Sequence, residues 1–345
     1  MNNKVTRLAV IGLGMASKPH LAALRQLAPA IEVAGVYTRN AERCASVAEQ
    51  IKCKVYNSIA AICSDPSVDG AIIITPPNAR MEIVRSLAAV GKHVLMEKPV
   101  ERNLVNANAI VKICEEAGVS LGIVLQHRFR AGAIALSDLV QSGKLGQIHL
   151  VRVVLPWWRD QSYYDQPGRG TYEVDGGGVL ITQAIHVMDL MLSLTGAVSE
   201  VSAMMGQTPL HDMEAEDFAN ASLRFENGAM GSITATTANY PGGAETLEID
   251  TDHAALRLTA GELVVAWRDG RTETFGEITG TGGGSDPMDF PCDWHSDLIA
   301  DFATSLKNET PPMITGRDAL EVHKLIDAIE RSAKTGNQVT LEKNP

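Results

Sequence analysis

Hydrophobic and polar positions alternate differently in the two parts of the chain. In the first third, apolar runs of strand length are separated by segments with helical periodicity. The predicted strands span residues 7–11, 31–38, 68–75, 93–96 and 119–125, and the predicted helices span 41–50, 79–90 and 104–117. Apolar strands such as Ala71–Ile74 between helices indicate a parallel, doubly wound α/β sheet, which we assign to a domain of residues 1–125.

Beyond Leu125 the strands follow one another with few helices between them. Strands are predicted at 147–155, 200–203, 218–225, 229–238, 246–250 and 255–259, with hairpin turns at 226–228 and 268–270. These runs predict a mostly antiparallel sheet in a second domain, residues 126–345, with one face covered or used as an interface. Helical patterns at 294–306 and 317–334 are expected to pack beside the first domain.

The first strand leads into a glycine loop and then into a helix. Strand, Gly12-x-Gly14 and helix together form the context that a dinucleotide fingerprint requires. Gly12 permits a tight turn, and Gly14 lets a pyrophosphate approach the backbone beside Met15 and Ala16, where the helix N-terminus supplies N–H donors. Ser17 replaces the third glycine of the strict pattern.

Ligands of such sheets bind at the carboxyl ends of the strands. Two further loops lie there, Thr75-Pro76-Pro77-Asn78 and Glu97-Lys98-Pro99. Lys98 is expected to face the cofactor crevice, where desolvation and nearby cations lower the pKa of an amine towards the working range. An ordinary surface lysine at a strand end is the alternative, and Lys98-Pro99 is a candidate cis turn.

A third motif is the turn Gly176–Gly178, followed by an apolar helical pattern. Thr182, His186 and Asp189 stand at i, i+4 and i+7, so an α-helix would place them on one face. The carboxylate can fix the tautomer of an imidazole that titrates near neutrality. A buried histidine satisfied by a neighbouring acid is the alternative interpretation.

These three motifs, in this order, resemble those of the Gfo/Idh/MocA oxidoreductases over nearly the whole chain. The resemblance implies an N-terminal Rossmann domain and a C-terminal α/β domain whose large, open, mostly antiparallel sheet mediates homodimers or homotetramers. It implies that Lys98 is catalytic and that His186 contacts the substrate hydroxyl. Many members carry an aspartate where this chain has Thr182, which leaves the general base open. Thr182 followed by Gln183 is similar to a subgroup that includes sugar-nucleotide 3-dehydrogenases.

Substrate-side residues are expected in the segment before the glycine turn. Aromatic faces stack on sugar C–H surfaces, and guanidinium groups bind hydroxyls or phosphates. The candidates there are Trp157, Tyr163, Tyr164 and Arg169, to which we add Arg128, and we place Gln126 with the cofactor. A loop packed by its own aromatics, or a subunit contact, is the alternative.

The choice between NAD and NADP depends on the end of the second strand, Tyr37-Thr38-Arg39-Asn40. An acid usually binds the ribose diol of NAD at this point, and here there is none. The Thr38 hydroxyl and the Arg39 guanidinium suit a 2′-phosphate, which favours NADP. If Arg39 instead stacks on adenine, either cofactor fits.

Composition narrows the class further. Among 345 residues, 41 acids against 30 bases give a net charge of −11, which argues against nucleic-acid or membrane-surface partners. No apolar stretch approaches the ~20 residues that span a bilayer, and the early first strand leaves no room for a signal peptide. The five cysteines, without C-x-x-C spacing, predict free thiols in a cytoplasmic protein. No metal site is expected; we interpret 211–214 as a solvated loop and 280–285 as a flexible surface loop.

The sequence therefore predicts an NAD(P)-dependent oxidoreductase. It would transfer a hydride between nicotinamide and a hydroxyl-bearing carbon of a sugar, sugar derivative or sugar nucleotide, while Lys98 and His186 handle the proton. Two alternatives stay open. One is an NAD-dependent glycosidase that oxidises its substrate transiently, and the other is a nucleotide-sensing regulator without catalysis.

Overall fold

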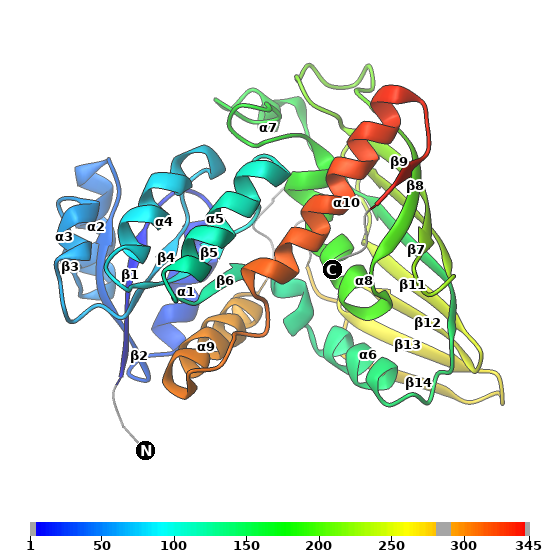
Figure 1. Cartoon of the computed structure of the whole chain (residues 1–345), viewed down its shortest axis with the longest axis horizontal. Coiled ribbons are helices and arrows are strands. Elements are labelled where there is room, and N and C mark those ends of the chain that lie inside the picture. Colours follow the sequence, from blue (N-terminus) through cyan, green and yellow to red (C-terminus); the bar gives the residue numbers. More distant parts are fainter. Residues whose placement is uncertain (1–4, 281–290, 342–345) are drawn as a thin grey trace. The chain divides into compact units, whose positions relative to one another are not determined.

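The chain divides into two compact units. The computed structural model describes residues 5–280 and 291–341; residues 281–285 of the glycine-rich stretch lie outside them (Figure 1). The first unit comprises residues 1–125 and 291–320, and the second comprises residues 126–290 and 321–345. Helix α10, Gly316–Thr335, belongs in part to each unit.

The first unit contains a six-stranded, entirely parallel sheet in the order β3-β2-β1-β4-β5-β6. Its strands are β1 (Thr6–Ile11), β2 (Ile31–Tyr37), β3 (Lys54–Val55), β4 (Gly70–Ile73), β5 (His93–Glu97) and β6 (Leu121–Val124). The helices are α1 (Ser17–Gln26), α2 (Ala41–Ile51), α3 (Ile59–Cys63), the 3₁₀ turn η1 (Pro77–Ala79), α4 (Arg80–Ala88), α5 (Leu104–Glu116) and α9 (Asp293–Asn308). The predicted Rossmann fold is confirmed, and the strand order reverses between β1 and β4, which is where such sheets bind ligands.

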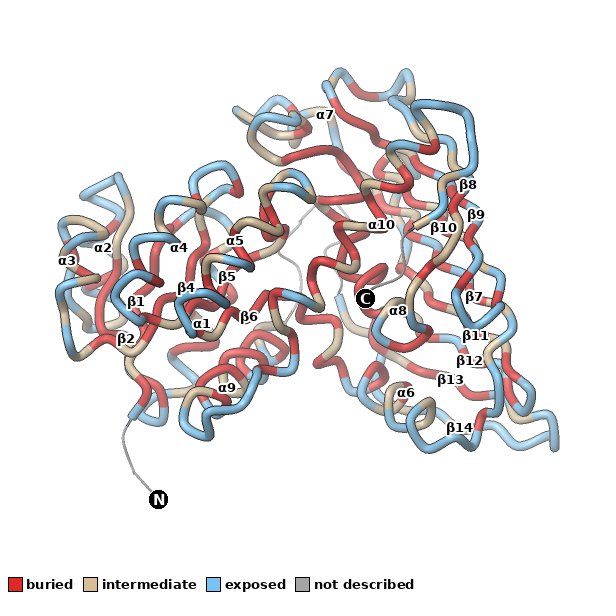
Figure 2. Tube along the Cα trace, in the orientation of Figure 1, coloured by how far each residue is buried: buried red, intermediate tan, exposed pale blue. Residues whose placement is uncertain are grey.

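Burial explains why the central strands are apolar throughout. Leu8, Ala9 and Val10 of β1 are fully buried, as are Ala71 and Ile72 of β4. Helix α1 packs against α9 and α4 against α5, and right-handed crossovers place these two pairs on opposite faces of the sheet. Figure 2 shows the resulting buried strands beneath partly exposed helices.

The second unit contains a nine-stranded sheet in the order β14-β13-β12-β11-β7-β10-β9-β8-β15. Its strands are β7 (Ile148–Pro156), β8 (Val198–Gly206), β9 (Phe218–Phe225), β10 (Met230–Thr236), β11 (Thr246–Thr251), β12 (Ala254–Thr259), β13 (Glu262–Trp267), β14 (Thr272–Phe275) and β15 (Val339–Thr340). The helical segments are η2 (Gln126–Phe129), α6 (Ala131–Gln141), α7 (Gln161–Tyr164), η3 (Leu180–Ala184) and α8 (Ile185–Thr195). Both predicted hairpin turns join antiparallel strands, whereas β7 and β10 pair in parallel, so the sheet is mixed.

The two faces of this sheet differ in character. On one face Val151, Val153, Leu247 and Ile249 are buried, and helices α6 and α8 pack against it. The side chains between them on the other face are more polar, and Arg152 of β7 bridges to Glu248 of β11 at 2.9 Å. The alternation of apolar and polar positions along the strands follows from this one-sided burial.

The helix after the glycine turn is less regular than the sequence suggested. Leu180–Ala184 forms one π-helical turn, and the α-helix proper begins at Ile185. Thr182 therefore lies in the π turn, whereas His186 and Asp189 lie in α8. The expectation of one regular α-helix through all three residues was wrong, because the first turn is a π turn, which contains more residues per turn than an α-helix.

Candidate active site

The carboxyl edge of the Rossmann sheet begins with the glycine loop between β1 and α1. Gly12 has φ +96°, and a Cβ there would lie 2.8 Å from the backbone of Ile74 and Thr75, so only glycine fits. Around Gly14 nothing lies within 4 Å of an added Cβ, which leaves an open cradle on that side. Ser17 closes the turn by donating its hydroxyl to the Gly14 carbonyl at 2.7 Å.

Arg80 ties the next two loops of this edge together. Its fully buried guanidinium donates to the Thr75 carbonyl at 2.9 and 2.7 Å, and also to the carbonyls of Glu97 and Pro99. Burial lowers the pKa of Arg80 to about 10, against the opposing effect of the negative charges of Glu97 and Glu101. The loops after β4 and β5 are therefore held in one arrangement by a single side chain.

Lys98 follows β5, and the Lys98–Pro99 peptide bond is cis. The lysine is half-buried, and its backbone N–H donates to Glu97 Oε2 at 3.1 Å. The other carboxylate oxygen of Glu97 lies 2.7 Å from His20 Nε2, and the His295 ring meets His20 edge-on with centroids 4.9 Å apart. Burial would raise the pKa of Glu97, but the His20 hydrogen bond and nearby positive charges lower it instead.

The same three side chains offer the one candidate metal site among the described residues. His20, Glu97 and His295 bring potential ligand atoms within 4.8 Å of one another. The 2.7 Å separation of His20 Nε2 and Glu97 Oε1 is that of a hydrogen bond, so a shared proton accounts for it. Burial and the electrostatic effect of the neighbouring His20 ring lower the pKa of His295 to about 3, which keeps the His295 imidazole neutral. His20, Glu97 and His295 therefore form a buried cluster that is connected to the Lys98 backbone through Glu97.

The residues at this edge fit a dinucleotide. Thr75 Oγ1 is buried and has no hydrogen-bond partner within the described part of the chain. The N-cap of α1, Ala16, provides no side-chain cap, which leaves the helix N-terminus to the Gly14 cradle. Pro76, Asn78 and Arg39 are exposed beside these loops. Thr38 N–H and the Cys44 sulfur lie 3.0 Å apart.

In the second unit the glycine turn is docked on a buried glutamate. Glu216 Oε2 accepts the Gly178 N–H at 2.9 Å, and Oε1 accepts the Leu180 N–H at 3.0 Å. A Cβ on Gly178 would lie 1.7 Å from the Glu216 carbonyl oxygen, so the turn requires glycine. A Cβ on Gly177 would lie 3.9 Å from oxygens of both Glu216 and Glu330, so the two carboxylates face the same turn.

His186 is buried in α8 and contacts a second histidine. The His127 ring stacks on it, with centroids 4.8 Å apart and planes at 23°. Asp189 receives two hydrogen bonds from Arg128, at 2.7 and 2.6 Å. The Thr182 hydroxyl lies 2.5 Å from the Gly178 carbonyl oxygen and also contacts the Gln183 amide oxygen.

The substrate-side candidates surround a half-buried tyrosine. The guanidinium carbons of Arg159 and Arg169 lie 5.6 and 5.2 Å from the centre of the Tyr163 ring. Trp157 is buried against Arg159, and its indole Nε1 has no hydrogen-bond partner among the residues described. Tyr164 is buried as well, with its hydroxyl 2.5 Å from Thr237 Oγ1, so it belongs to the packing of the segment.

The expectation of a solvated loop at 211–214 is correct for Asp212 and Glu214, which are exposed, and wrong for His211. His211 is 5 % exposed, with Nδ1 2.7 Å from Asp217 and Nε2 2.8 Å from the Arg159 carbonyl oxygen. Both ring nitrogens are thus engaged, because the segment of Trp157–Arg159 crosses the loop of His211. The Gln126 side chain, at the start of this unit, is buried, and its Oε1 has no partner within residues 5–280 and 291–341.

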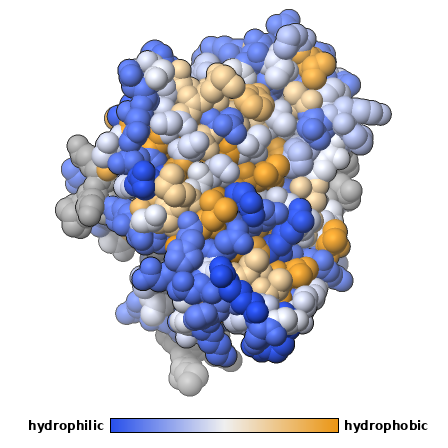
Figure 3. Space-filling view, turned by 90° about the vertical axis from the view of Figure 1, so that its right-hand side faces the viewer, coloured by the Kyte–Doolittle hydropathy of each residue, from blue (hydrophilic) through white to orange (hydrophobic). Residues whose placement is uncertain are grey.

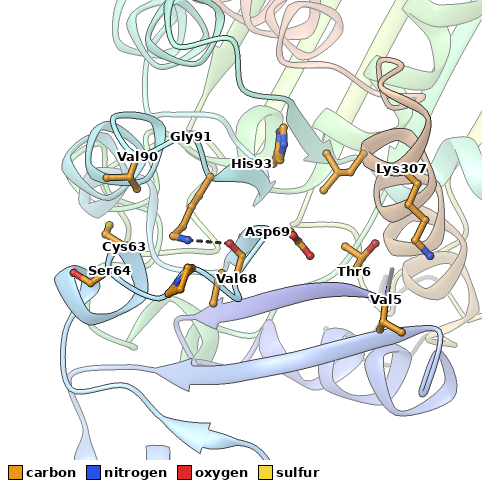
Figure 4. A pocket seen from close by; sticks show the side chains of 13 residues that line it. Val5, Thr6, Cys63, Ser64, Val68, Asp69, Val90, Gly91, His93 and Lys307 are labelled. Carbon is orange, nitrogen blue, oxygen red and sulfur yellow. Dashed lines mark hydrogen bonds between the residues drawn. The ribbon is translucent and has the colours of Figure 1, made fainter. Parts of the chain in front are cut away.

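A separate pocket lies at the opposite, amino edge of the Rossmann sheet. It has a volume of about 530 Å³ and is lined by Thr6, Asp69, Lys92, His93 and Lys307, among others (Figure 4). Lys92 Nζ donates to the carbonyls of Asp65 and Val68 at 2.8 and 2.9 Å, so its ammonium is held by the backbone. Because parallel sheets bind ligands at their carboxyl edge, this pocket is not the dinucleotide site.

Several side chains that organise these sites carried no recognised sequence signal. His20 and Arg80 lie within predicted helices, and Glu216 lies 38 residues from the glycine turn that it binds. His127 lies between Gln126 and Arg128, which the sequence analysis named, and was not itself singled out. Arg80 lies at the start of the predicted helix 79–90. If the sequence had suggested that Arg80 is buried, a search for its partners would have followed, since a buried charge requires them.

Comparison with known proteins assigns the chain to a family. The profile described as "Oxidoreductase family, NAD-binding Rossmann fold" matches residues 6–124, and the "GFO/IDH/MocA C-terminal domain" matches residues 134–257. The chain belongs to the GFO/IDH/MocA oxidoreductases, as the motifs had indicated.

Its relatives include sugar and polyol dehydrogenases. Myo-inositol 2-dehydrogenase of Thermotoga maritima is 26% identical over 347 residues, covering 97% of this chain and 98% of the relative. UDP-N-acetylglucosamine 3-dehydrogenase of Acidithiobacillus ferrooxidans is 27% identical over 67% of this chain and 66% of its own length. The WlbA dehydrogenase of Bordetella pertussis superposes with a TM-score of 0.84 at 28% identity, covering 99% of this chain and 100% of WlbA.

The carboxylate pair at the glycine turn generates a prediction of pH-dependent stability. Burial and the negative charges of Glu216 and Asp327 raise the pKa of Glu330 from 4.5 to about 7. Between these values the folded chain retains a proton that the unfolded chain releases, so stability falls as the pH rises through this window. Glu330→Gln should therefore melt higher than wild type at pH 8 and at the same temperature at pH 4, as measured by thermal unfolding.

The matched control is Glu321→Gln on the same helix, where Glu321 pairs with Lys324 at 2.8 Å. It should not show the upward shift at pH 8. An equal shift of Glu330→Gln at both pH values would contradict the raised pKa.

Proposed function

We propose that this chain is an NAD(P)-dependent dehydrogenase or reductase of sugars or sugar nucleotides, with Lys98 and His186 as its proton-handling residues. The observation that carries the proposal is the Lys98 loop. It follows strand β5 at the ligand-binding edge of an NAD-binding domain and is held by Arg80 and the Glu97 cluster. Bound nicotinamide supplies the hydride acceptor or donor. Lys98 Nζ takes or returns the proton of the reacting hydroxyl, and His186 hydrogen-bonds to the same group.

The family assignment weighs against the two alternatives left open by the sequence. The relatives named above are dehydrogenases, and none of their names describes a glycosidase or a sensor. A net change in the amount of reduced cofactor distinguishes the proposed enzyme from both alternatives, since a transiently oxidising glycosidase recycles its cofactor and a sensor consumes none.

Within carbohydrates we favour a substrate that carries negative charge, such as a sugar nucleotide. Arg159 and Arg169 both lie over Tyr163, and this cluster supplies cations in a chain whose net charge is −11. A planar ring for a sugar face and guanidinium forks for phosphate or carboxylate suit such a molecule. The similar WlbA dehydrogenase is described in complex with NADH and UDP-GlcNAcA.

We also propose that the chain forms a homodimer or homotetramer in the cytoplasm through the face of the nine-stranded sheet that α6 and α8 leave uncovered. Figure 3 shows apolar side chains among polar ones on the side of the molecule where this sheet lies. Met204, Met230 and Val154 are 66%, 45% and 40% exposed there. A large sheet face with exposed apolar side chains is typical of an interface.

The five free cysteines suit a reducing compartment. In the described segments, no helix is both long and apolar enough to cross a membrane.

The first test is a panel of polyols, aldoses and sugar nucleotides, assayed with NAD and NADP by the absorbance of the reduced cofactor. On the substrate found, Lys98→Met should lower kcat by about 10²–10⁴-fold, because it removes the proton-transfer group and keeps the length of the side chain. Cofactor affinity should stay within about twofold of wild type, and Lys112→Met, at an exposed lysine of α5, should behave as wild type. Near-normal turnover of Lys98→Met would remove Lys98 from the mechanism.

A second prediction separates His186 from Thr182. His186→Ala should lower kcat/KM by about 10²–10⁴-fold if the imidazole handles the proton. Thr182→Val should cost about tenfold or less, because a lost neutral hydrogen bond contributes ~0.5–1.5 kcal/mol. Steady-state kinetics with both variants decide the order, and a fully active His186→Ala enzyme would make His186 a packing residue.

The third prediction concerns the preference for NADP. Arg39 is exposed at the end of β2, and its loss should weaken NADP(H) binding by about 1.5–3 kcal/mol if it pairs with the 2′-phosphate. NAD(H) binding should change much less. Arg43→Ala, in the first turn of α2, is the control for general charge, and calorimetric titration measures the affinity of wild type and both variants for each cofactor. Equal weakening of both cofactors by Arg39→Ala would assign Arg39 to adenine stacking.

A further inference from the structure

A second buried histidine lies directly against His186. His127 in η2 is 4% exposed and His186 in α8 is 7% exposed, and their rings stack with centroids 4.8 Å apart. A histidine ring can adopt a broad range of χ2 angles. A flat neighbour at stacking distance therefore restricts the plane of the ring. Whatever fixes the His127 ring therefore also constrains His186.

The His127 ring is itself held by a buried ion pair. Its Nε2 lies 2.6 Å from Arg130 Nη2, and Arg130 Nη1 donates to Glu245 Oε1 at 2.5 Å. Arg130 and Glu245 are each 3% exposed. The partners come from separate elements: Arg130 is the N-cap of α6, and Glu245 immediately precedes β11.

The chemistry of the guanidinium determines the tautomer of His127. An arginine side chain has donors and no acceptor, so His127 Nε2 must accept, and the ring proton resides on Nδ1. A second proton on Nε2 would break this contact and place a positive charge against the buried Arg130 cation. Arg128, next to His127 in the chain, and Asp189, in the same helix as His186, form a bidentate pair with each other.

From this geometry we propose that His127 is a positioning residue for His186. The His127 ring stays neutral, carries its proton on Nδ1 and is fixed by Arg130 and Glu245. It keeps the His186 ring in one plane and does not compete with His186 for a proton. The proposal rests on the proposed function of His186, since only then does the orientation of its ring nitrogens affect a reaction.

The tautomer can be tested without any assay of activity. In the full-length protein labelled with ¹⁵N-histidine, the His127 signals are assigned by their loss in His127→Gln, and long-range proton–nitrogen spectra report the protonation of each nitrogen. We expect His127 to remain the neutral Nδ1–H form from pH 5.5 to pH 9. An Nε2–H tautomer, or titration of His127 within this range, would overturn the proposal.

Kinetics then test the positioning role with variants that separate the ring from the hydrogen bond. His127→Phe keeps a flat ring and loses the acceptor, whereas His127→Gln keeps an acceptor for Arg130 and loses the ring. We expect kcat to fall about 10²-fold in His127→Gln, the scale of a misplaced reacting group, and less in His127→Phe, with KM and cofactor affinity within about twofold in both.

The control is His149→Gln, at an exposed histidine of β7 that pairs with Asp252. Unchanged kcat in both His127 variants, or a loss confined to KM, would overturn the positioning role. If His186→Ala proves fully active, the proposed function of His186 fails, and the spectra still decide the state of His127 independently.

Discussion

Arg80 is the interaction on which the dinucleotide edge of the first unit depends. Loops at the carboxyl end of a parallel sheet leave backbone carbonyls without ladder partners, and a buried carbonyl without a partner is costly. The guanidinium satisfies those of Thr75, Glu97 and Pro99 from a single point. The charges of Glu97 and Glu101 oppose the desolvation of the cation only in part, since burial still lowers the pKa of Arg80. Because one group serves both loops, Thr75 and Lys98 keep a fixed separation.

The second unit solves the corresponding problem with the opposite charge. At the start of a helix the unpaired backbone groups are N–H donors, so the complementary side chain is a carboxylate. Glu216 accepts from Gly178 and Leu180 and thereby fixes the turn from which the π turn and α8 continue. Burial raises the pKa of Glu216, and the backbone N–H donors oppose that rise. The positions of Thr182 and His186 in turn follow from this docking.

The sequence predicted those features that depend on local periodicity or on glycine. Alternating strands and helices specified the first sheet, and Gly12 marked a turn where a Cβ would meet the backbone of Ile74. The turn at 268–270 was recognised, but β13 and β14 on either side of it were not assigned as strands. Spacing rules reach about one helical turn, so they found His186 and Asp189 and missed His127, Glu216 and Arg80. The π turn was also missed. Its first residue, Leu180, donates its backbone N–H to Glu216, and such a tertiary contact leaves no local pattern in the sequence.

The presence of a threonine rather than an aspartate at position 182 can be explained by its hydrogen bond and by the charges of nearby residues. Two ion pairs involve residues close to His127 or His186 in the chain: Arg128 with Asp189, and Arg130 with Glu245. Each pair is neutral as a whole. The Thr182 side chain faces the Gly178 carbonyl oxygen at 2.5 Å, where a hydroxyl can donate. An aspartate carboxylate at this position would face that oxygen with a second acceptor and would add an uncompensated negative charge. A neutral donor is therefore the residue type that suits this contact with the Gly178 carbonyl oxygen.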